Sequence, residues 1–312
     1  MKRYLFGVDL GGTTVKNGIF TREGDLLHKW EIPTDLREGG ANILADIAAS
    51  LRKTAEEQGL SYEEFGGLGI GIPGTVDREG NVFGCVNLGW GFTRVKEILE
   101  HLSGLPVEVG NDADVAAMGE LWQGAGKGCR DLVMITLGTG LGGGVISDGH
   151  LIRGAHGFGA EVGHMCVCPT ETEYCNCGKR GCLEQYCSAT GIARQAEKNL
   201  LRSGRESSLR QLDSITAKDV FDACKAGDPF AVDQVDRFGR TLAMGMSYIA
   251  CVTDPEIFVI GGGVSAAGTI LTEAVMRHYG DFTYGRQRDV DIVLAQLGND
   301  AGIYGSAGLF MH

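Results

Sequence analysis

Three cysteines and one histidine near the middle of the chain have the spacing of a metal site. Cys175, Cys177 and Cys182 fall within eight residues, and His164 precedes the first of them by eleven. Thiolates and imidazole are ligands that zinc prefers, and four protein ligands leave no open position for chemistry. The spacing therefore predicts one structural zinc ion, bound by these four side chains, that orders a loop.

Three carboxylates are the candidates for chemistry on a substrate. Glu161 and Glu184 stand close to the outermost zinc ligands, so the ordered loop is predicted to hold both in place. Asp112 follows a strand-like run and precedes a helical pattern, which makes it a candidate general base. The alternative for Asp112 is a helix cap, because Asp and Asn often begin helices. Since Asn111 precedes it, one of the two can cap the helix while the other faces a ligand.

Short glycine clusters follow several strand-like runs. Of the 312 residues 50 are glycine, more than twice the usual share of about 7%. Gly11–Thr13 follows a strand that ends at Asp9, and Leu137–Gly144 follows a strand over 132–136. Their unhindered N–H groups and hydroxyls suit a phosphate, although a plain hairpin turn is the alternative for the first. Neither has a Walker A ending and neither begins a helix, so both common nucleotide fingerprints are excluded.

Strand-like and helix-like patterns alternate along the chain and predict an α/β fold. The predicted strands are 4–9, 15–21, 26–32, 68–72, 107–109, 132–136, 145–146, 151–152, 256–260 and 292–295. The predicted helices are 41–58, 95–101, 115–122, 189–202, 217–226, 229–252, 270–279 and 298–310. The order of strand, glycine turn, strand, turn and strand occurs twice, so the sequence predicts a duplicated fold.

Composition and charge narrow the class of protein. Hydrophobic residues make up 43% and charged residues 22% of the chain, which is typical of a soluble globular protein. A net charge of −12 argues against nucleic acid and anionic membranes as partners. We find no export signal and no apolar run of the roughly 18 residues that a membrane helix needs. We therefore expect a cytoplasmic protein whose ten cysteines are reduced.

Together these motifs resemble the ROK family of sugar kinases, and within it the bacterial glucokinases. The resemblance runs in order along nearly the whole chain. Its most specific parts are Glu161–His164 and Cys175–Glu184. The other segments that carry it are Asp9–Thr13, Gly69–Gly74, Asn111–Asp112, Leu137–Gly142 and Gly261–Gly263.

The resemblance implies the actin-like ATPase fold, which is ribonuclease H-like: two duplicated α/β domains around a cleft. We expect an N-terminal domain over 1–115, with a C-terminal helix at about 298–312 packed back on it. The C-terminal domain is expected over 116–297 and contains the zinc loop. The resemblance also implies a homo-oligomer, either a dimer or a tetramer.

The resemblance further implies phosphorylation of a hexose by ATP with Mg²⁺, with Asp112 as the catalytic base and Asp9 orienting a magnesium-bound water. His164 would bind zinc through one ring nitrogen and a sugar hydroxyl through the other, with a backbone carbonyl as the alternative second partner. The implied sugar-binding residues are Gly74, Asn87, Asn111, Asp112, Glu161, His164 and Glu184. The implied nucleotide-binding residues are Asp9, Gly11, Gly12, Thr13, Thr136, Gly138, Thr139, Gly140, Gly142, Gly261, Gly262, Gly263 and Val264.

Several alternatives remain open at this stage. Glucose is the leading substrate, and N-acetylmannosamine, fructose, mannose and allose are its rivals. Polyphosphate is a second possible donor. A sugar-sensing regulator without catalysis is the rival from another class, but only eight residues precede Asp9, too few for the DNA-binding segment of the family's repressors. Cys166 and Cys168, where the family more often has other residues, compete as zinc ligands or form an oxidised pair.

Overall fold

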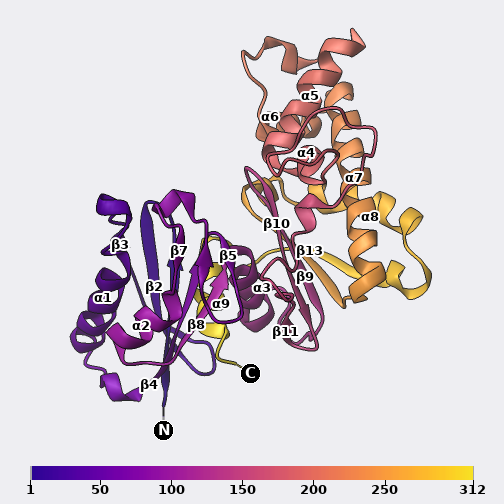
Figure 1. Cartoon of the computed structure of the whole chain (residues 1–312). Helices are drawn as coiled ribbons and strands as arrows, with labels where there is room; N and C mark the ends of the chain where they lie inside the picture. The colour runs from indigo at the N-terminus through magenta and orange to yellow at the C-terminus, as the bar shows by residue number, and fades with distance from the viewer. Residues whose placement is uncertain (1, 312) are drawn as a thin grey trace. The chain divides into compact units, whose positions relative to one another are not determined.

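The computed structural model describes residues 2–311 and contains two five-stranded sheets with the same strand order. Figure 1 shows the helices and strands along the chain. The chain divides into two compact units. The first contains the chain up to Arg130, Gly144–Gly159 and the chain from Gln296 onward. The second contains Asp131–Gly143 and Ala160–Ala295.

The sheet of the first unit has the order β3-β2-β1-β4-β8. Its strands are β1 (Tyr4–Leu10), β2 (Thr14–Thr21), β3 (Leu26–Pro33), β4 (Phe65–Ile72) and β8 (Val107–Asn111). β1 pairs with β2 in antiparallel and with β4 in parallel orientation, and β8 runs parallel to β4. The carboxyl ends of β1, β4 and β8 therefore lie at one edge of the sheet.

Helices cover both faces of this sheet, as alternating patterns predict. α1 (Ile43–Glu57) and α2 (Val95–Ser103) bury their apolar sides in one core with β1, β4 and β8. α9 (Ala301–Gly308) packs on the other face, where Ile303 and Ala307 are fully buried with Leu5 and Phe20. The apolar burial on both faces stabilises the central strands.

The first unit extends beyond residue 115, where the sequence analysis placed the end of the N-terminal domain. It keeps all of α3 (Asp112–Gln123) together with Gly144–Gly159 and the C-terminal helix α9. α3 belongs to it because it packs directly on α9: a Cβ on Gly305 would overlap the carbonyl oxygen of Val115. A small third sheet of β5 (Thr75–Val76), β6 (Val82–Phe83) and β7 (Phe92–Thr93) was not predicted, because two-residue strands show no periodicity.

The second sheet has the order β11-β10-β9-β12-β13. Its strands are β9 (Leu132–Leu137), β10 (Leu141–Ser147), β11 (His150–Leu151), β12 (Ile257–Gly261) and β13 (Asp291–Leu294). Strands β9, β12 and β13 belong to the second unit, whereas β11 and the end of β10 fall within Gly144–Gly159 of the first. β12 runs parallel to both β9 and β13, and β10 is antiparallel to β11. Each sheet thus begins with a hairpin meander and continues with parallel strands, which confirms the predicted duplication.

The remaining helices belong to the second unit. They are α4 (Glu184–Cys187), α5 (Ala189–Ser203), α6 (Ala217–Lys225), α7 (Pro229–Thr253) and α8 (Thr269–Phe282). Asp228 caps α7 and Pro229 occupies its first position, where the missing N–H costs nothing. Within residues 2–311, no helix combines the length and the apolar character needed to cross a membrane.

Short 3-10 helices connect these elements. They are η1 (Arg37–Gly39), η2 (Tyr62–Glu64), η3 (Val86–Leu88), η4 (Val162–His164), η5 (Ser208–Gln211), η6 (Gly263–Ala267), η7 (Gly285–Asp289) and η8 (Gly298–Asp300). Two of them carry predicted site residues at their ends: His164 ends η4, and Gly263 begins η6.

Candidate functional site

Asn111 and Asp112 lie where β8 ends and α3 begins. The side-chain oxygen of Asn111 accepts a hydrogen bond of 2.9 Å from the N–H of Ala113, so Asn111 is the helix cap. Its amide nitrogen donates to the carbonyl oxygen of Gly74 at 2.7 Å. The structure therefore brings Asn111 and its neighbour Asp112 close to Gly74, and Asn111 fixes the loop that contains Gly74.

Asp112 has the electrostatics of a group suited to proton transfer. Burial of its carboxyl group raises its pKa, and hydrogen bonds from the backbone of Ala113 and Asp112 itself only partly offset this. The residue as a whole remains accessible to solvent, so a ligand can approach it. A carboxyl group in partly desolvated surroundings binds a proton more readily than an exposed aspartate does.

Asp9 lies near Asp112 in the first unit. Burial raises the pKa of Asp9, the Lys16 ammonium lowers it, and the negative charge of Asp112 raises it again. The Nζ atom of Lys16 is 3.8 Å from a carboxylate oxygen of Asp9 and also donates to the carbonyl of Asn299 at 3.0 Å. Two carboxylates that influence each other form a negative site suited to a metal ion or to a proton in transfer.

The turn Gly11–Thr13 joins β1 to β2 beside Asp9. The N–H of Gly11 donates to the carbonyl of Thr14 at 3.0 Å, and the hydroxyl of Thr34 donates to the carbonyl of Gly11 at 2.7 Å. Asn87, in η3, lies against this turn, because a Cβ on Gly12 would be 3.8 Å from its Cβ atom. The predicted sugar- and phosphate-binding residues that belong to the first unit thus lie mostly near the carboxyl ends of its parallel strands.

The second unit has an equivalent turn, Gly138–Gly140, between β9 and β10. The N–H of Gly138 donates to the carbonyl of Gly140 at 3.0 Å, which closes the turn. Thr136 pairs with Gly261 across β9 and β12, so the glycine run after β12 lies beside the turn. Gly262 has a φ of 81° and lies against the backbone of Leu137, where a side chain would clash.

A pocket of about 510 Å³ opens beside this turn in the second unit. Gly138, Thr139, Gly263 and Val264 line it, whereas Thr136, Gly140, Gly142, Gly261 and Gly262 do not. Further lining residues come from the start and one face of α6, which the sequence analysis did not single out: Thr216, Ala217, Lys218, Phe221, Asp222 and Lys225. The spacing 217, 221 and 225 marks one helix face, but it does not tell which cavity that face meets.

The four predicted zinc ligands form one cluster. The ligand atoms of His164, Cys175, Cys177 and Cys182 all lie within 4.8 Å of one another. The Sγ atoms of Cys177 and Cys182 are 3.6 Å apart, and Sγ of Cys175 is 3.9 Å from Nδ1 of His164. A tetrahedral zinc ion with Zn–S bonds of about 2.3 Å separates its ligand atoms by roughly 3.8 Å. The donor set and its spacing therefore fit zinc.

Cys166 and Cys168 lie outside this cluster. The Sγ atom of Cys168 contacts the hydroxyl of Thr170 at 3.5 Å. Hydrogen bonds from Tyr186 and Thr170 lower the pKa of Cys168. Among the described residues, the group that fits a metal ion is the predicted one.

His164 and the two glutamates lie around this cluster. Nδ1 of His164 faces Cys175, which leaves Nε2 on the other side of the ring, 4.0 Å from a carboxylate oxygen of Glu161. Glu161 is exposed, whereas Glu184 is partly buried. One carboxylate oxygen of Glu184 accepts from the N–H of Leu141 at 2.9 Å, and the other lies 3.5 Å from Sγ of Cys175. The bond to Leu141 was not foreseen, because the two residues are far apart in sequence.

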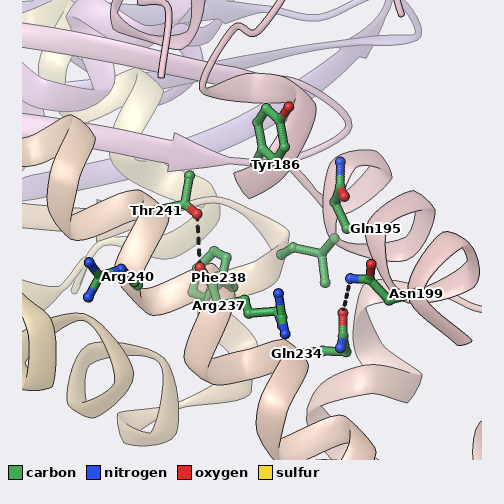
Figure 2. Close-up of a pocket in the computed structure, with 9 residues that line it drawn as sticks. Tyr186, Gln195, Asn199, Gln234, Arg237, Phe238, Arg240 and Thr241 are labelled. Atoms are coloured by element: carbon green, nitrogen blue, oxygen red, sulfur yellow. Dashed lines mark hydrogen bonds between the residues drawn. The ribbon is translucent and has the colours of Figure 1, made fainter. Parts of the chain in front are cut away.

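Another pocket of about 300 Å³ lies between α4, α5 and α7 (Figure 2). Its lining includes Tyr186, Gln195 and Phe238, and Asn199 donates to Gln234 at 2.7 Å on one wall. None of the predicted site residues lines it.

The arrangement defines the class of protein. Two sheets of one strand order, each with a glycine- and threonine-containing turn after its first strand, agree with the actin-like ATPase fold that the resemblance implies. Comparison with known proteins narrows this class: the profile of the ROK family matches residues 5–312. The chain therefore belongs to the ROK family.

The similar proteins agree with this membership. The chain is 41% identical to a glucokinase of Halalkalibacterium halodurans over 98% of this chain and 94% of that protein. It is 36% identical to a glucokinase of Thermotoga maritima over 99% of this chain and 97% of that protein. Among solved structures, a ROK family glucokinase from Streptomyces griseus in complex with glucose and AMPPNP is 35% identical, with a TM-score of 0.75 and coverage of 98% of each chain.

Proposed function

We propose that this protein is a glucokinase that transfers the γ-phosphoryl group of ATP to the 6-hydroxyl of glucose. The observation that carries the proposal is Asp112, an accessible carboxylate with a raised pKa beside Asp9. It lies in a chain that matches glucokinases over nearly its full length. Phosphoryl transfer needs a base that orients the attacking hydroxyl, together with groups that stabilise charge on the phosphates.

Asp112 acts as the base in this proposal. Its carboxylate accepts the proton of the sugar hydroxyl as the hydroxyl oxygen forms a bond to the γ-phosphorus. The bond between that phosphorus and the β,γ-bridging oxygen breaks, and ADP leaves with the electron pair. The raised pKa suits this role, because a more basic carboxylate takes the proton more effectively.

Seven residues bind the sugar hydroxyls in this proposal. The residues are Gly74, Asn87, Asn111, Asp112, Glu161, His164 and Glu184. His164 contributes through Nε2, because its Nδ1 faces Cys175. A pocket of carboxylates and amides discriminates strongly against an analogue that lacks a hydroxyl, since its buried polar groups are then left unpaired.

The glycine turns bind the nucleotide in this proposal. Gly11–Thr13 and the residues Thr136, Gly138, Thr139, Gly140 and Gly142 serve the phosphates. The adenosine occupies the pocket of about 510 Å³, whose lining contains Phe221, Gly263 and Val264. Gly261 and Gly262 lead into this lining at the end of β12. Mg²⁺ accompanies ATP and neutralises phosphate charge, and Asp9 is the carboxylate that would hold its water shell.

We propose that His164, Cys175, Cys177 and Cys182 hold one structural zinc ion. The spacing of the four donors supports this assignment. The zinc orders the loop that carries His164 and Glu184. We also propose that the enzyme is a dimer or tetramer and works in the cytoplasm, where ATP is available; light scattering on the purified protein tests the oligomer.

The test is a coupled assay of ADP release over a panel of hexoses that includes glucose, mannose, fructose, allose and N-acetylmannosamine. We expect the highest kcat/KM with glucose and ATP, and little turnover with polyphosphate as donor. A higher value for another hexose moves the proposal to that sugar. Sugar binding without turnover of any hexose refutes the enzyme and favours a sugar-sensing regulator.

A further inference from the structure

The turn Gly138–Leu141 is held from one side by the segment that follows the zinc ligand Cys182. The N–H of Leu141 donates to the carboxylate of Glu184 at 2.9 Å. The N–H of Ala189 donates to the carbonyl of Gly138 at 2.8 Å, and the hydroxyl of Thr190 donates to the carbonyl of Thr139 at 2.9 Å. Three of the four residues of the turn, Gly138, Thr139 and Leu141, are therefore bonded to a single stretch, Glu184–Thr190.

The turn and the strand after it are held from the other side by the segment that contains His164. A Cβ on Gly163 would overlap the carbonyl oxygen of Leu141, so the two backbones touch. A Cβ on Gly143 would lie 2.5 Å from a methyl carbon of Val162. Both glycines are needed for this close approach, because a larger residue at either place would push the segments apart.

The predicted zinc site joins these two segments. His164 belongs to the segment that contains Val162 and Gly163, and Cys182 lies two residues before the stretch Glu184–Thr190. Cys175 links the predicted zinc site to Glu184, because the Sγ atom of Cys175 lies 3.5 Å from the second carboxylate oxygen of Glu184. A pocket of about 250 Å³ is lined by residues of the turn, of the cysteine loop and of the stretch Glu184–Thr190, among them Thr139, Cys175, Glu184 and Thr190.

We propose that the zinc loop is a clamp on the turn that binds the ATP phosphates, with Glu184 and Thr190 as its positioning residues. This inference rests on the proposed function of the turn and adds a role for the loop beyond holding sugar ligands. A glycine-rich turn loses much conformational entropy when it orders around a ligand. A clamp that orders it in advance removes that cost from nucleotide binding.

The experiment measures ADP binding without sugar, and glucose binding without nucleotide, by titration calorimetry on the full chain. Thr190→Val removes one hydrogen bond to the turn and leaves the predicted zinc and sugar residues in place. We expect ADP affinity to fall about three- to tenfold, the effect of one ordinary hydrogen bond. Glucose affinity and zinc content should stay unchanged, and Thr190→Ser should restore ADP binding. In the steady-state assay, the KM for ATP should rise, whereas the KM for glucose and kcat should stay unchanged.

Thr241→Val is the matched control. The hydroxyl of Thr241 donates to the carbonyl of Arg237 within α7, away from the turn, at 2.9 Å. We expect it to change neither affinity. Removal of zinc with a chelator should weaken ADP binding by about tenfold or more in protein whose circular dichroism is unchanged.

Two results overturn the clamp while the glucokinase proposal stands. One is a Thr190→Val enzyme that turns over glucose with wild-type affinity for ADP. The other is a zinc-free, folded protein that loses glucose binding only. A wild-type protein that binds neither ADP nor glucose instead refutes the proposed function, and the clamp with it.

Discussion

The carboxylate of Glu120, in α3, accepts a hydrogen bond of 2.8 Å from the backbone N–H of Leu297, 177 residues further along the chain. It also accepts from the N–H of Gln296 and from the N–H of Ala125 at 2.8 Å. The side chain is completely buried, with 0% exposure. A single glutamate therefore anchors the chain that returns to the first unit ahead of α9.

We expect Glu120→Ala to lower the free energy of unfolding by about 3 kcal/mol or more, because several buried backbone N–H groups lose a charged acceptor. Urea denaturation followed by circular dichroism measures this. Glu97→Ala, at an exposed position of α2, is the control and should cost less than about 0.5 kcal/mol. Equal costs for both variants would show that the buried bonds contribute nothing.

We expect Asp112→Asn to lower kcat by at least about a hundredfold, because a general base contributes roughly 10²–10⁴ in rate. Glucose binding, measured by calorimetry, should change little. Glu108→Gln is the control, since Glu108 lies on β8, the strand that leads to Asp112, and pairs with Lys96 instead of facing Asp112's loop. Activity of Asp112→Asn within tenfold of the wild type would exclude Asp112 as the base.

The raised pKa of Asp112 predicts the direction of the pH profile. The base is active when it is ionised, and burial raises its pKa above the ordinary value of 3.8. We expect kcat/KM for glucose to fall as the pH is lowered, with a midpoint above 3.8. The measurement is a profile over pH 4–9 with circular dichroism at each point. A flat profile down to pH 4 in folded protein would contradict this assignment.

Metal analysis should find about one zinc ion per chain. We expect Cys177→Ser to lower the zinc content and the melting temperature, because a ligand is lost. Cys166→Ser should change neither, since Cys166 lies outside the cluster. Zinc loss in the Cys166→Ser protein, with full content in Cys177→Ser, would reverse the assignment.

Asp228 should make stability sensitive to acid. Burial favours a higher pKa for its carboxyl group, but hydrogen bonds from Ser208 and Ser207 and from the N–H group of Ala231 hold the pKa at about 2. The ionised group thus contributes stability that is complete above pH 3.8 and is lost as the pH falls towards 2.

We expect Asp228→Ala to cost about 1–2 kcal/mol at pH 7, the usual effect of losing a helix cap. Asp228→Asn keeps an oxygen at the cap and should cost less. It should also reduce the loss of stability between pH 4 and 2, measured by urea denaturation at each pH. An acid transition of Asp228→Asn identical to that of the wild type would exclude this linkage.

The sequence alone determined much of the fold and the ligand types. Periodicity located the long helices, such as α1 and α7, because apolar burial on one helix face imposes its own spacing. The repeated strand and glycine-turn order predicted the duplication. The cluster of His164, Cys175, Cys177 and Cys182 was predictable because metal chelation demands particular side chains at short range, and these lie close together in the sequence.

The tertiary structure decided which distant groups meet. No local pattern links Glu184 to Leu141, Glu120 to Leu297 or Asn111 to Gly74, since each pair is joined only when strands and helices pack. The sequence also did not predict which face of α6 lines the pocket of about 510 Å³, or how far the first unit extends. Sequence periodicity reports that a side chain is buried or exposed, whereas its partner is chosen by packing between elements far apart in the chain.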